Sequence, residues 1–119
     1  MWPTRLSRKQ EQGRQWENAA LAYLRRHGFV LIEANFRCKL GEIDLVVRDG
    51  PTLVFVEVRQ RAAGAPVDAA TSIGPAKIRR IVRAAQVYLQ RLSQTPPCRI
   101  DVVAIDGNNM QWIRNAIEM

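Results

Sequence analysis

Histidine and cysteine are scarce in this chain of 119 residues, which has one histidine and two cysteines. Cys38 and Cys98 are too few for a disulfide framework, and with His27 they cannot supply the four ligands of a Cys/His zinc site. The single histidine also weighs against a Ser-His-Asp triad. His27 precedes Gly28, and a histidine at the end of a helix followed by a capping glycine is the ordinary interpretation.

Long apolar runs are also absent. Residues 1–5 lead into a polar segment without the apolar region of a signal peptide, and no run is long enough to span a bilayer. The chain has no phosphate-binding P-loop, no dinucleotide-binding fingerprint and no internal repeat. We therefore expect a cytoplasmic protein with no membrane partner, folded as a single domain over residues 1–119.

Acidic residues are outnumbered, because 11 Asp and Glu oppose 18 Lys and Arg, for a net charge of +7 at pH 7. This balance favours a polyanionic partner such as nucleic acid. An anionic membrane surface would suit the same charge, but no basic amphipathic anchor is present. Many basic proteins are simply soluble, so charge alone does not establish the partner.

Two runs rich in β-branched residues, 42–47 and 53–59, flank a turn sequence and predict a β-hairpin. If the turn is centred between Gly50 and Pro51, one face of the hairpin is apolar throughout. The expected cross-strand pairs on that face are Val47 with Val54, Leu45 with Val56, and Ile43 with Val58. The expected pairs on the other face are Val46 with Phe55, Asp44 with Glu57, and Glu42 with Arg59.

The expected pair of Asp44 and Glu57 is unusual, because like charges placed directly opposite each other destabilise a sheet. A shared proton, a basic neighbour or a divalent cation would each relieve the repulsion, and a hard cation such as Mg²⁺ prefers carboxylate oxygens and water. The alternative is an edge hairpin whose acids face water and are matched by nearby arginines. The spacing leaves both interpretations open.

A capping box formed by Ser7 and Gln10 predicts an amphipathic helix over residues 7–27. One face of this helix carries four residues at spacings of three or four, namely Gly13, Glu17, Ala20 and Leu24. Glu17 is the unusual member, because a carboxylate on a core-facing stripe needs a partner. Either it belongs to a site, or it is a boundary residue that reaches solvent or pairs with Arg14.

The remaining elements follow from apolar patterning and turn residues. The expected elements are a strand over residues 29–36 beside the hairpin, a flexible connection over 60–74, a helix over 75–92, and a second hairpin from 99–105 and 110–114. Asp101 either approaches the acidic face or pairs with Arg99, and we favour the structural role.

Basic residues lie on both sides of the hairpin and at the start of the second helix. They are Arg37, Lys39, Arg61, Lys77, Arg79, Arg80 and Arg83. Such residues suit phosphate oxygens, and the helix N-terminus adds partial positive charge. A solvated basic face is the equally simple interpretation.

Four segments carry a family resemblance: GEIDLV at residues 41–46, FVEVRQR at 55–61, residues 77–80, and RIDVV at 99–103. Their order resembles the core of the PD-(D/E)xK nuclease superfamily, which has an acidic residue on one strand and an E-x-K element on the next. More closely, the chain is similar over nearly its whole length to the YraN-like family of small, largely uncharacterised endonuclease-like proteins.

The resemblance implies an α/β, restriction-endonuclease-like fold similar to that of archaeal Holliday-junction resolvases. The implied core is a mixed five-stranded sheet flanked by two main helices, in the order α-β-β-β-α-β-β. It also implies a nuclease site that uses Mg²⁺ or Mn²⁺. Asp44 and Glu57 would be the metal ligands there, and Glu17 would complete the acidic cluster.

One position departs from the superfamily, because Arg59 stands where the motif has lysine. A lysine can shift its pKa and act on water, whereas an arginine stays charged and offers a planar fork of donors. Arg59 would then bind phosphate or orient the attacking water, and Lys77 would supply the displaced ammonium. Otherwise the site has weak activity or none.

Three hypotheses follow from the sequence. The first is a metal-dependent endonuclease acting on DNA, including branched or otherwise structured DNA, for which a homodimer would suit cutting two strands related by two-fold symmetry. The second is a nucleic-acid-binding module on the same fold without useful catalysis. The third is an interaction protein that acts through self-association or a protein partner.

Overall fold

The computed structural model describes residues 7–119, so the segment formed by residues 1–6 lies outside the described residues. Seven elements follow one another along residues 7–119. They are α1 (Arg8–Arg26), β1 (Val30–Cys38), β2 (Gly41–Asp49), β3 (Thr52–Arg61), α2 (Pro75–Gln90), β4 (Cys98–Asp106) and β5 (Asn109–Ile117). The strands form a single sheet in the order β1-β2-β3-β4-β5, in which only β3 and β4 are parallel. The predicted α/β fold with a mixed five-stranded sheet is confirmed.

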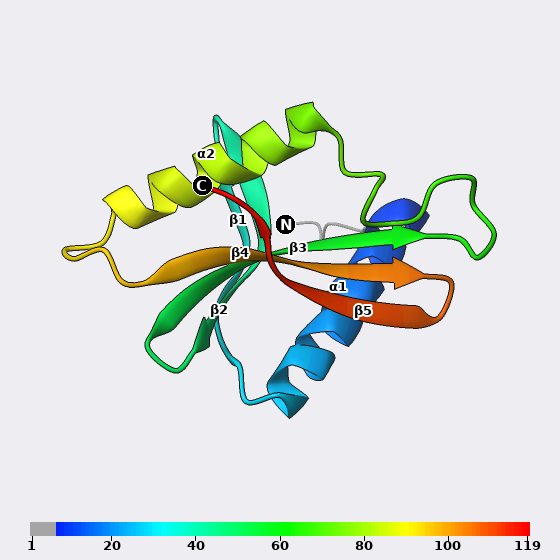
Figure 1. The fold of residues 1–119 in the computed structure, drawn as a ribbon, viewed down its shortest axis with the longest axis horizontal. Coiled ribbons are helices and arrows are strands. Elements are labelled where there is room, and N and C mark those ends of the chain that lie inside the picture. Colours follow the sequence, from blue (N-terminus) through cyan, green and yellow to red (C-terminus); the bar gives the residue numbers. More distant parts are fainter. Residues whose placement is uncertain (1–6) are drawn as a thin grey trace, which may run out of the picture.

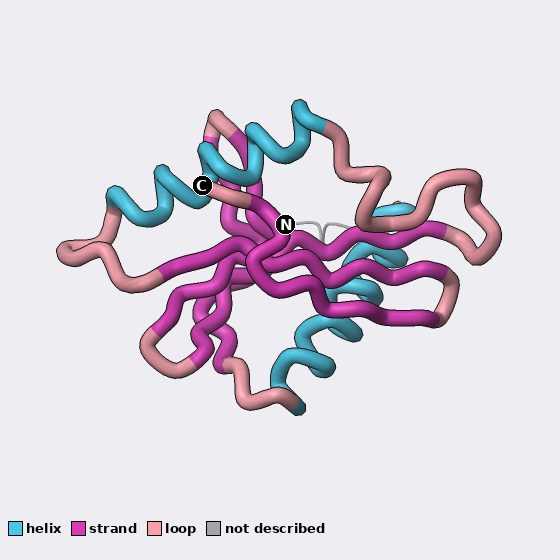
Figure 2. Tube along the Cα trace, viewed as in Figure 1, coloured by secondary structure: helices cyan, strands magenta, loops and turns pink. Residues whose placement is uncertain are grey.

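The two helices cover opposite faces of the sheet (Figures 1 and 2). The cluster on the α1 side includes Ala20 and Leu24 of α1, packed on Leu45, Val47, Val54 and Val56 of the hairpin. The cluster on the α2 side includes Ile81, Ala84 and Ala85 of α2, packed on Val46, Phe55, Ile100 and Val102. Burial of these apolar surfaces is the main force that holds the layers together.

The first residues of both helices follow the capping rules that predicted them. Ser7 Oγ accepts a hydrogen bond from the Gln10 amide at 3.1 Å, and Gln10 Oε1 accepts one from the Ser7 amide at 2.9 Å. This reciprocal pair satisfies amides that have no partner inside the helix. Pro75 is the first residue of α2, and the helix ends at Gln90, two residues before its predicted limit. None of the helices among residues 7–119 is both long and apolar enough to cross a membrane.

The predicted register of the hairpin is confirmed near its turn. Leu45 pairs with Val56, Val46 with Phe55, and Val47 with Val54. The regular pairing ends there, so the expected backbone pairs Ile43 with Val58, Asp44 with Glu57, and Glu42 with Arg59 do not form. Ile43 packs on the α2 side of the sheet, although Leu45, two residues away, packs on the α1 side.

This change of face coincides with an irregularity in the neighbouring strand. Asn35 of β1 has a left-handed backbone with φ of 56°. On either side of it, Ala34 pairs with Leu45 and Phe36 pairs with Ile43. Side chains of a regular strand alternate between faces, so the exchange between Leu45 and Ile43 requires both strands to turn at this point. The end of the β1–β2 ribbon thereby leaves β3 and packs against α2.

Contact between this ribbon and α2 depends on Gly41. A Cβ at Gly41 would overlap the backbone carbonyl of Arg80, so the helix rests directly on the start of β2. Only glycine permits two backbones to approach this closely. Gly41 therefore allows α2, with Lys77 in its first turn, to lie beside the end of the hairpin.

Asp101 has the structural role that we favoured. Its buried carboxylate accepts hydrogen bonds from Arg99 Nε at 3.0 Å, Trp112 Nε1 at 2.9 Å and the Asn115 amide at 2.8 Å. Arg99 also binds Asp49 at 3.1 Å. These three donors satisfy the buried carboxylate, and the bonds from Trp112 and Asn115 join β5 to β4.

Candidate active site

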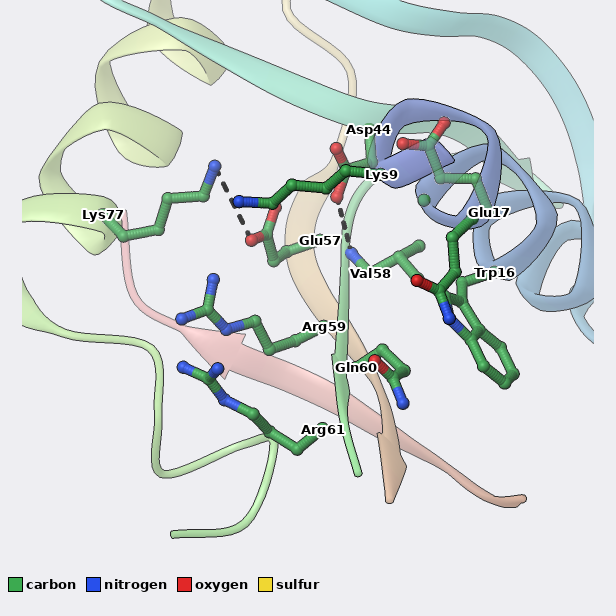
Figure 3. Close-up of a pocket in the computed structure, with 12 residues that line it drawn as sticks. Lys9, Trp16, Glu17, Asp44, Glu57, Val58, Arg59, Gln60, Arg61 and Lys77 are labelled. Carbon is green, nitrogen blue, oxygen red and sulfur yellow. Dashed lines mark hydrogen bonds and ion pairs between the residues drawn. The ribbon is translucent and has the colours of Figure 1, made fainter. Parts of the chain in front are cut away.

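A cavity of about 580 Å³ lies where β3 extends beyond the end of its pairing with β2. Its lining includes six of the residues singled out in the sequence, namely Glu17, Asp44, Glu57, Arg59, Arg61 and Lys77. They come from α1, β2, β3 and α2, so four elements meet at this point (Figure 3). Glu57, Arg59 and Arg61 extend from β3 toward the side on which Lys77 lies, whereas Trp16 and Gln60 lie on the other side.

Asp44 occupies the point at which the two strands of the hairpin separate. Its Oδ2 accepts a hydrogen bond from the Val58 amide at 2.8 Å, which replaces the backbone partner that β2 no longer offers. In a strand, the amide and carbonyl of one residue point toward the same edge, so the Val58 carbonyl also faces this open edge. The cavity therefore combines a carboxylate with a backbone oxygen that has no ladder partner on β2.

Glu57 is a buried acid with incomplete hydrogen bonding. Its side chain is 2% exposed, and Oε1 has no hydrogen-bond partner among the described residues. Burial, followed by the charge of Asp44 and by a hydrogen bond to Asp44 that needs the protonated form, raises the pKa of Glu57 to about 9. The charges of Lys77 and Arg59 oppose this rise. An ionised Glu57 thus needs another positive charge close by.

Lys77 connects the acidic pair to α2. Its Nζ lies 3.8 Å from Glu57 Oε2 and 3.4 Å from Glu42 Oε1 (Figure 3 shows the contact with Glu57). The lysine is partly buried, so its charge is less screened than that of a surface lysine. The first turn of α2 therefore places an ammonium group in the cavity, and its role in a nuclease site stays a prediction.

Arg59 points into the cavity but is already held by the connection between β3 and α2. Its Nε donates to Ser72 Oγ at 2.9 Å, and a terminal nitrogen donates to the Ser72 carbonyl at 3.2 Å. Ser72 Oγ in turn donates to the Ala69 carbonyl, and the Ala69 amide donates to Asp106 Oδ1 at 2.8 Å. The connection that we expected to be flexible is thus anchored at residues 69–72.

Glu17 reaches the cavity from α1. Burial and the charge of Asp44 raise the pKa of Glu17, and the Asn35 side chain, Arg14 and Arg37 partly offset that rise. Both neighbours that the sequence allowed for Glu17 are therefore present, because the charges of Asp44 and of Arg14 both act on its carboxyl group. Among residues 7–119, no three His, Cys, Asp or Glu side chains are grouped as a metal-binding cluster, so a role for Glu17 as a ligand stays a prediction.

Asp44 and Glu57 are the residues suited to hold a divalent cation. Carboxylates, a backbone carbonyl and water are the ligands that Mg²⁺ and Mn²⁺ prefer. The unpartnered Oε1 of Glu57 and the mutual repulsion of the two acids fit such an ion, because the ion would satisfy the first and cancel the second.

The other predicted nucleic-acid contacts lie outside this cavity. Arg37 lines a neighbouring cavity and lies 3.7 Å from Glu42. The rest are exposed residues, namely Lys39 between β1 and β2, and Arg79, Arg80 and Arg83 on α2. The structure therefore brings Arg61 and Lys77 to the acidic pair and leaves the remaining basic residues on the surface around it.

Six residues that line the cavity were not among the predicted site residues, namely Lys9, Gln12, Gly13, Trp16, Val58 and Gln60. The helical period offered a signal for the first four, because they share one flank of α1 with the stripe that contains Glu17. Trp16 packs against the α1-side cluster and also lines the cavity, with its indole nitrogen buried and unpartnered among the described residues.

Comparison with known proteins gives one consistent family. The model of the uncharacterised protein family UPF0102 matches residues 16–105. A UPF0102 protein of Janthinobacterium sp. is 56% identical over 92% of this chain and 89% of its own length. Another, from Herminiimonas arsenicoxydans, is 52% identical over 98% of this chain and 97% of its own, and one from Cupriavidus pinatubonensis is 51% identical over 100% and 94%.

Proposed function

Because the chain belongs to the UPF0102 family, which is the YraN-like family, and has an acidic pair at an open strand edge, we propose that it is a metal-dependent DNA endonuclease. The reaction is hydrolysis of a phosphodiester bond, with branched or otherwise structured DNA as the preferred substrate. Mg²⁺ or Mn²⁺ is the proposed cofactor, and Asp44 and Glu57 are the proposed ligands.

The observation that supports this proposal most is the state of Glu57. A carboxyl group that is 2% exposed, has one oxygen without a partner among the described residues and lies beside a second carboxyl group destabilises the fold. A hydrophobic residue at position 57 would give a more stable hairpin, so stability does not explain the presence of Glu57. A cation bound at the site during function would explain it.

A bound divalent cation would activate water and stabilise negative charge on the phosphate. The protein's own residues would do the rest. Lys77 and Arg61 would neutralise phosphate oxygens, and Arg59 would present its remaining donors while Ser72 fixes the orientation of its guanidinium. Glu57, which binds a proton near neutral pH, would release it when the cation is bound.

The test is cleavage of labelled four-way-junction, flap, single-stranded and duplex DNA in Mg²⁺ or Mn²⁺, with EDTA as the first control. Asp44→Ala and Glu57→Ala should each lower the cleavage rate by more than about 100-fold, beyond the loss typical of removing a residue that only supports a metal ligand. Glu118→Ala, an exposed carboxylate near the C-terminus, is the matched control and should cleave like the wild type. Cleavage that persists in both site variants would identify a contaminating nuclease and refute the proposal.

The binding module without catalysis is the second candidate, and the position of Arg59 favours it. The guanidinium holds Ser72 in place of water or substrate, and it cannot lose a proton as the lysine of the superfamily motif can. This candidate predicts no cleavage of any substrate, and binding of DNA that Asp44→Ala leaves unchanged or strengthens by removing a negative charge.

A further inference from the structure

We propose that the substrate engages this site as an unpaired nucleic-acid strand lying in two connected cavities on both flanks of α1, with Gly13 keeping the connection open. The inference rests on the proposed function, because it takes Asp44 and Glu57 as the place of cleavage. It adds the substrate class, namely a single strand, a flap or the unpaired strand at a branch point.

The second cavity lies on the other flank of α1 and measures about 490 Å³. It is lined by Gln10, Gly13, Arg14, Glu17, Asn35 and Arg37. Gly13 and Glu17 line both this cavity and the one that contains the acidic pair. The two cavities therefore meet at one turn of the helix.

Gly13 has no evident structural reason to be glycine. It lies inside α1, where glycine is the least favourable residue apart from proline, and a Cβ added there would meet no atom of residues 7–119 within 4 Å. Within that part of the chain, no close approach and no positive φ requires a glycine at this position. A larger side chain at this position would project into the space that the two cavities share.

The charges along the two cavities suit a phosphodiester strand. Arg14 and Arg37 line the second cavity, and Lys77, Arg59 and Arg61 line the first. Asp44 and Glu57 line the first cavity, and Glu17 lines both. A nucleic-acid strand lying across both cavities would place one phosphate at Asp44 and Glu57 and neighbouring phosphates at the basic residues. Arg37 is 75% exposed on its side chain, so its 3.7 Å ion pair with Glu42 is weak enough to exchange for a phosphate.

The remaining lining residues offer contacts that unpaired bases can use. Trp16 presents an aromatic ring and a buried indole nitrogen without a partner among the described residues, and Asn35 and Gln60 present amides. Stacking on an aromatic ring and hydrogen bonds to the Watson–Crick edge of a base are available only when the base is free of its complement.

The experiment measures binding of a fluorescent single-stranded oligonucleotide by anisotropy in EDTA, where no cleavage takes place, and then cleavage of the same oligonucleotide in Mn²⁺. Gly13→Leu is compared with Gln15→Leu, which adds the same side chain to an exposed position of α1 that lines neither cavity. We expect Gly13→Leu to weaken single-strand binding by about tenfold and Gln15→Leu to change it by less than about twofold. Gly13→Ala should have a smaller effect than Gly13→Leu, and Gly13→Gln provides a polar variant if the leucine impairs folding.

The outcomes separate this inference from the proposed function. If Gly13→Leu binds and cleaves single strands as Gln15→Leu does, or if the wild type binds no single strand, the connected cavities are not used and the inference is wrong. If the wild type binds and Gly13→Leu does not, the inference holds even where no variant cleaves, and only the nuclease proposal fails. Thermal unfolding confirms that each variant is folded, and leucine should raise the midpoint because it favours helix more than glycine does.

Discussion

At the scale of single residues, Glu57 dominates the behaviour of the site. The carboxyl group is buried beside Asp44, and these two causes raise its pKa from 4.5 to about 9. Between those values the folded protein holds a proton that the unfolded chain releases. The free energy of unfolding must therefore fall as the pH rises through this window. Glu17, whose pKa is also raised, contributes in the same direction.

We predict that the metal-free protein is less stable at about pH 8 than at about pH 6 and that Glu57→Gln removes most of this difference. Each unit of pKa difference corresponds to about 1.4 kcal/mol, so a change larger than about 1 kcal/mol is expected for the wild type. Urea unfolding at the two pH values measures it. Glu17→Gln is the control, and it should leave most of the pH dependence of the free energy of unfolding unchanged.

With Mg²⁺ or Mn²⁺ present, the free energy of unfolding should rise rather than fall from pH 6 to pH 8. The reason is that the ion binds the ionised pair and stabilises the folded state by mass action. A stability that is flat from pH 6 to pH 8 in the wild type would show that Glu57 is already ionised in the metal-free protein. Burial beside Asp44 would then not hold a proton on this carboxyl group.

At the scale of elements, the site depends on how the β1–β2 ribbon leaves β3. The ribbon turns at Asn35 and Asp44, and its end packs against α2 through Gly41. That departure frees the edge of β3 from Val58 onward and brings Lys77 to within 3.8 Å of Glu57. The packing of the elements and the chemistry of the site are therefore linked through one glycine.

We predict that Gly41→Ala destabilises the protein by about 2–3 kcal/mol, because the new methyl group overlaps the backbone of Arg80 and a backbone cannot move as cheaply as a side chain. Denaturant unfolding measures the loss. Gly13→Ala is the matched control, since the same substitution there meets open space and should be neutral or stabilising.

If Gly41→Ala proved as stable as the wild type, α2 would not rest on the hairpin as described. The position of Lys77 would then need another explanation. The same variant should also cleave DNA more slowly, because displacement of α2 would move the Lys77 ammonium away from Asp44 and Glu57. A cleavage assay measures this effect.

At the scale of the whole molecule, the net charge of +7 includes exposed arginines on both helices. Three arginines of α2 are exposed outside the cavity, namely Arg79, Arg80 and Arg83. Arg25 and Arg26 are also exposed, but they lie in the last turn of α1, away from the cavity lining. Substitutions in these two groups of arginines can therefore distinguish attraction of DNA by net charge from contact of DNA with the surface beside the cavity.

We predict that DNA affinity falls steeply with salt, and that the double variant Arg79→Gln with Arg83→Gln reduces the slope of log K against log salt by roughly one for each phosphate that is no longer neutralised. The double variant Arg25→Gln with Arg26→Gln removes the same charge and should change the slope less. Binding isotherms at several salt concentrations measure both. Equal effects of the two pairs would mean that net charge, rather than a surface beside the cavity, attracts the DNA.

Local patterns in the sequence determined much of this protein. The alternation of Leu45 and Val47 against Val54 and Val56 predicted the hairpin and its register near the turn, because period-two burial and turn residues act over a few residues. The capping residues Ser7 and Pro75 likewise predicted where the helices begin. Asp44, Glu57 and Lys77 were singled out from their residue types and the family resemblance, and the structure places them in one cavity.

Only the tertiary structure determines that the edge of β3 is left unpaired at the site. The expected pairing of Asp44 with Glu57 is replaced by a hydrogen bond from the Val58 amide to Asp44, since the ribbon turns toward α2 at this point. Nothing in the alternation of residues 42–47 shows that turn, because it results from packing between segments about forty residues apart, Gly41 and Arg80. The sequence supplied the chemical groups, and the packing of α2 on the hairpin determined that they face an open edge rather than a closed sheet.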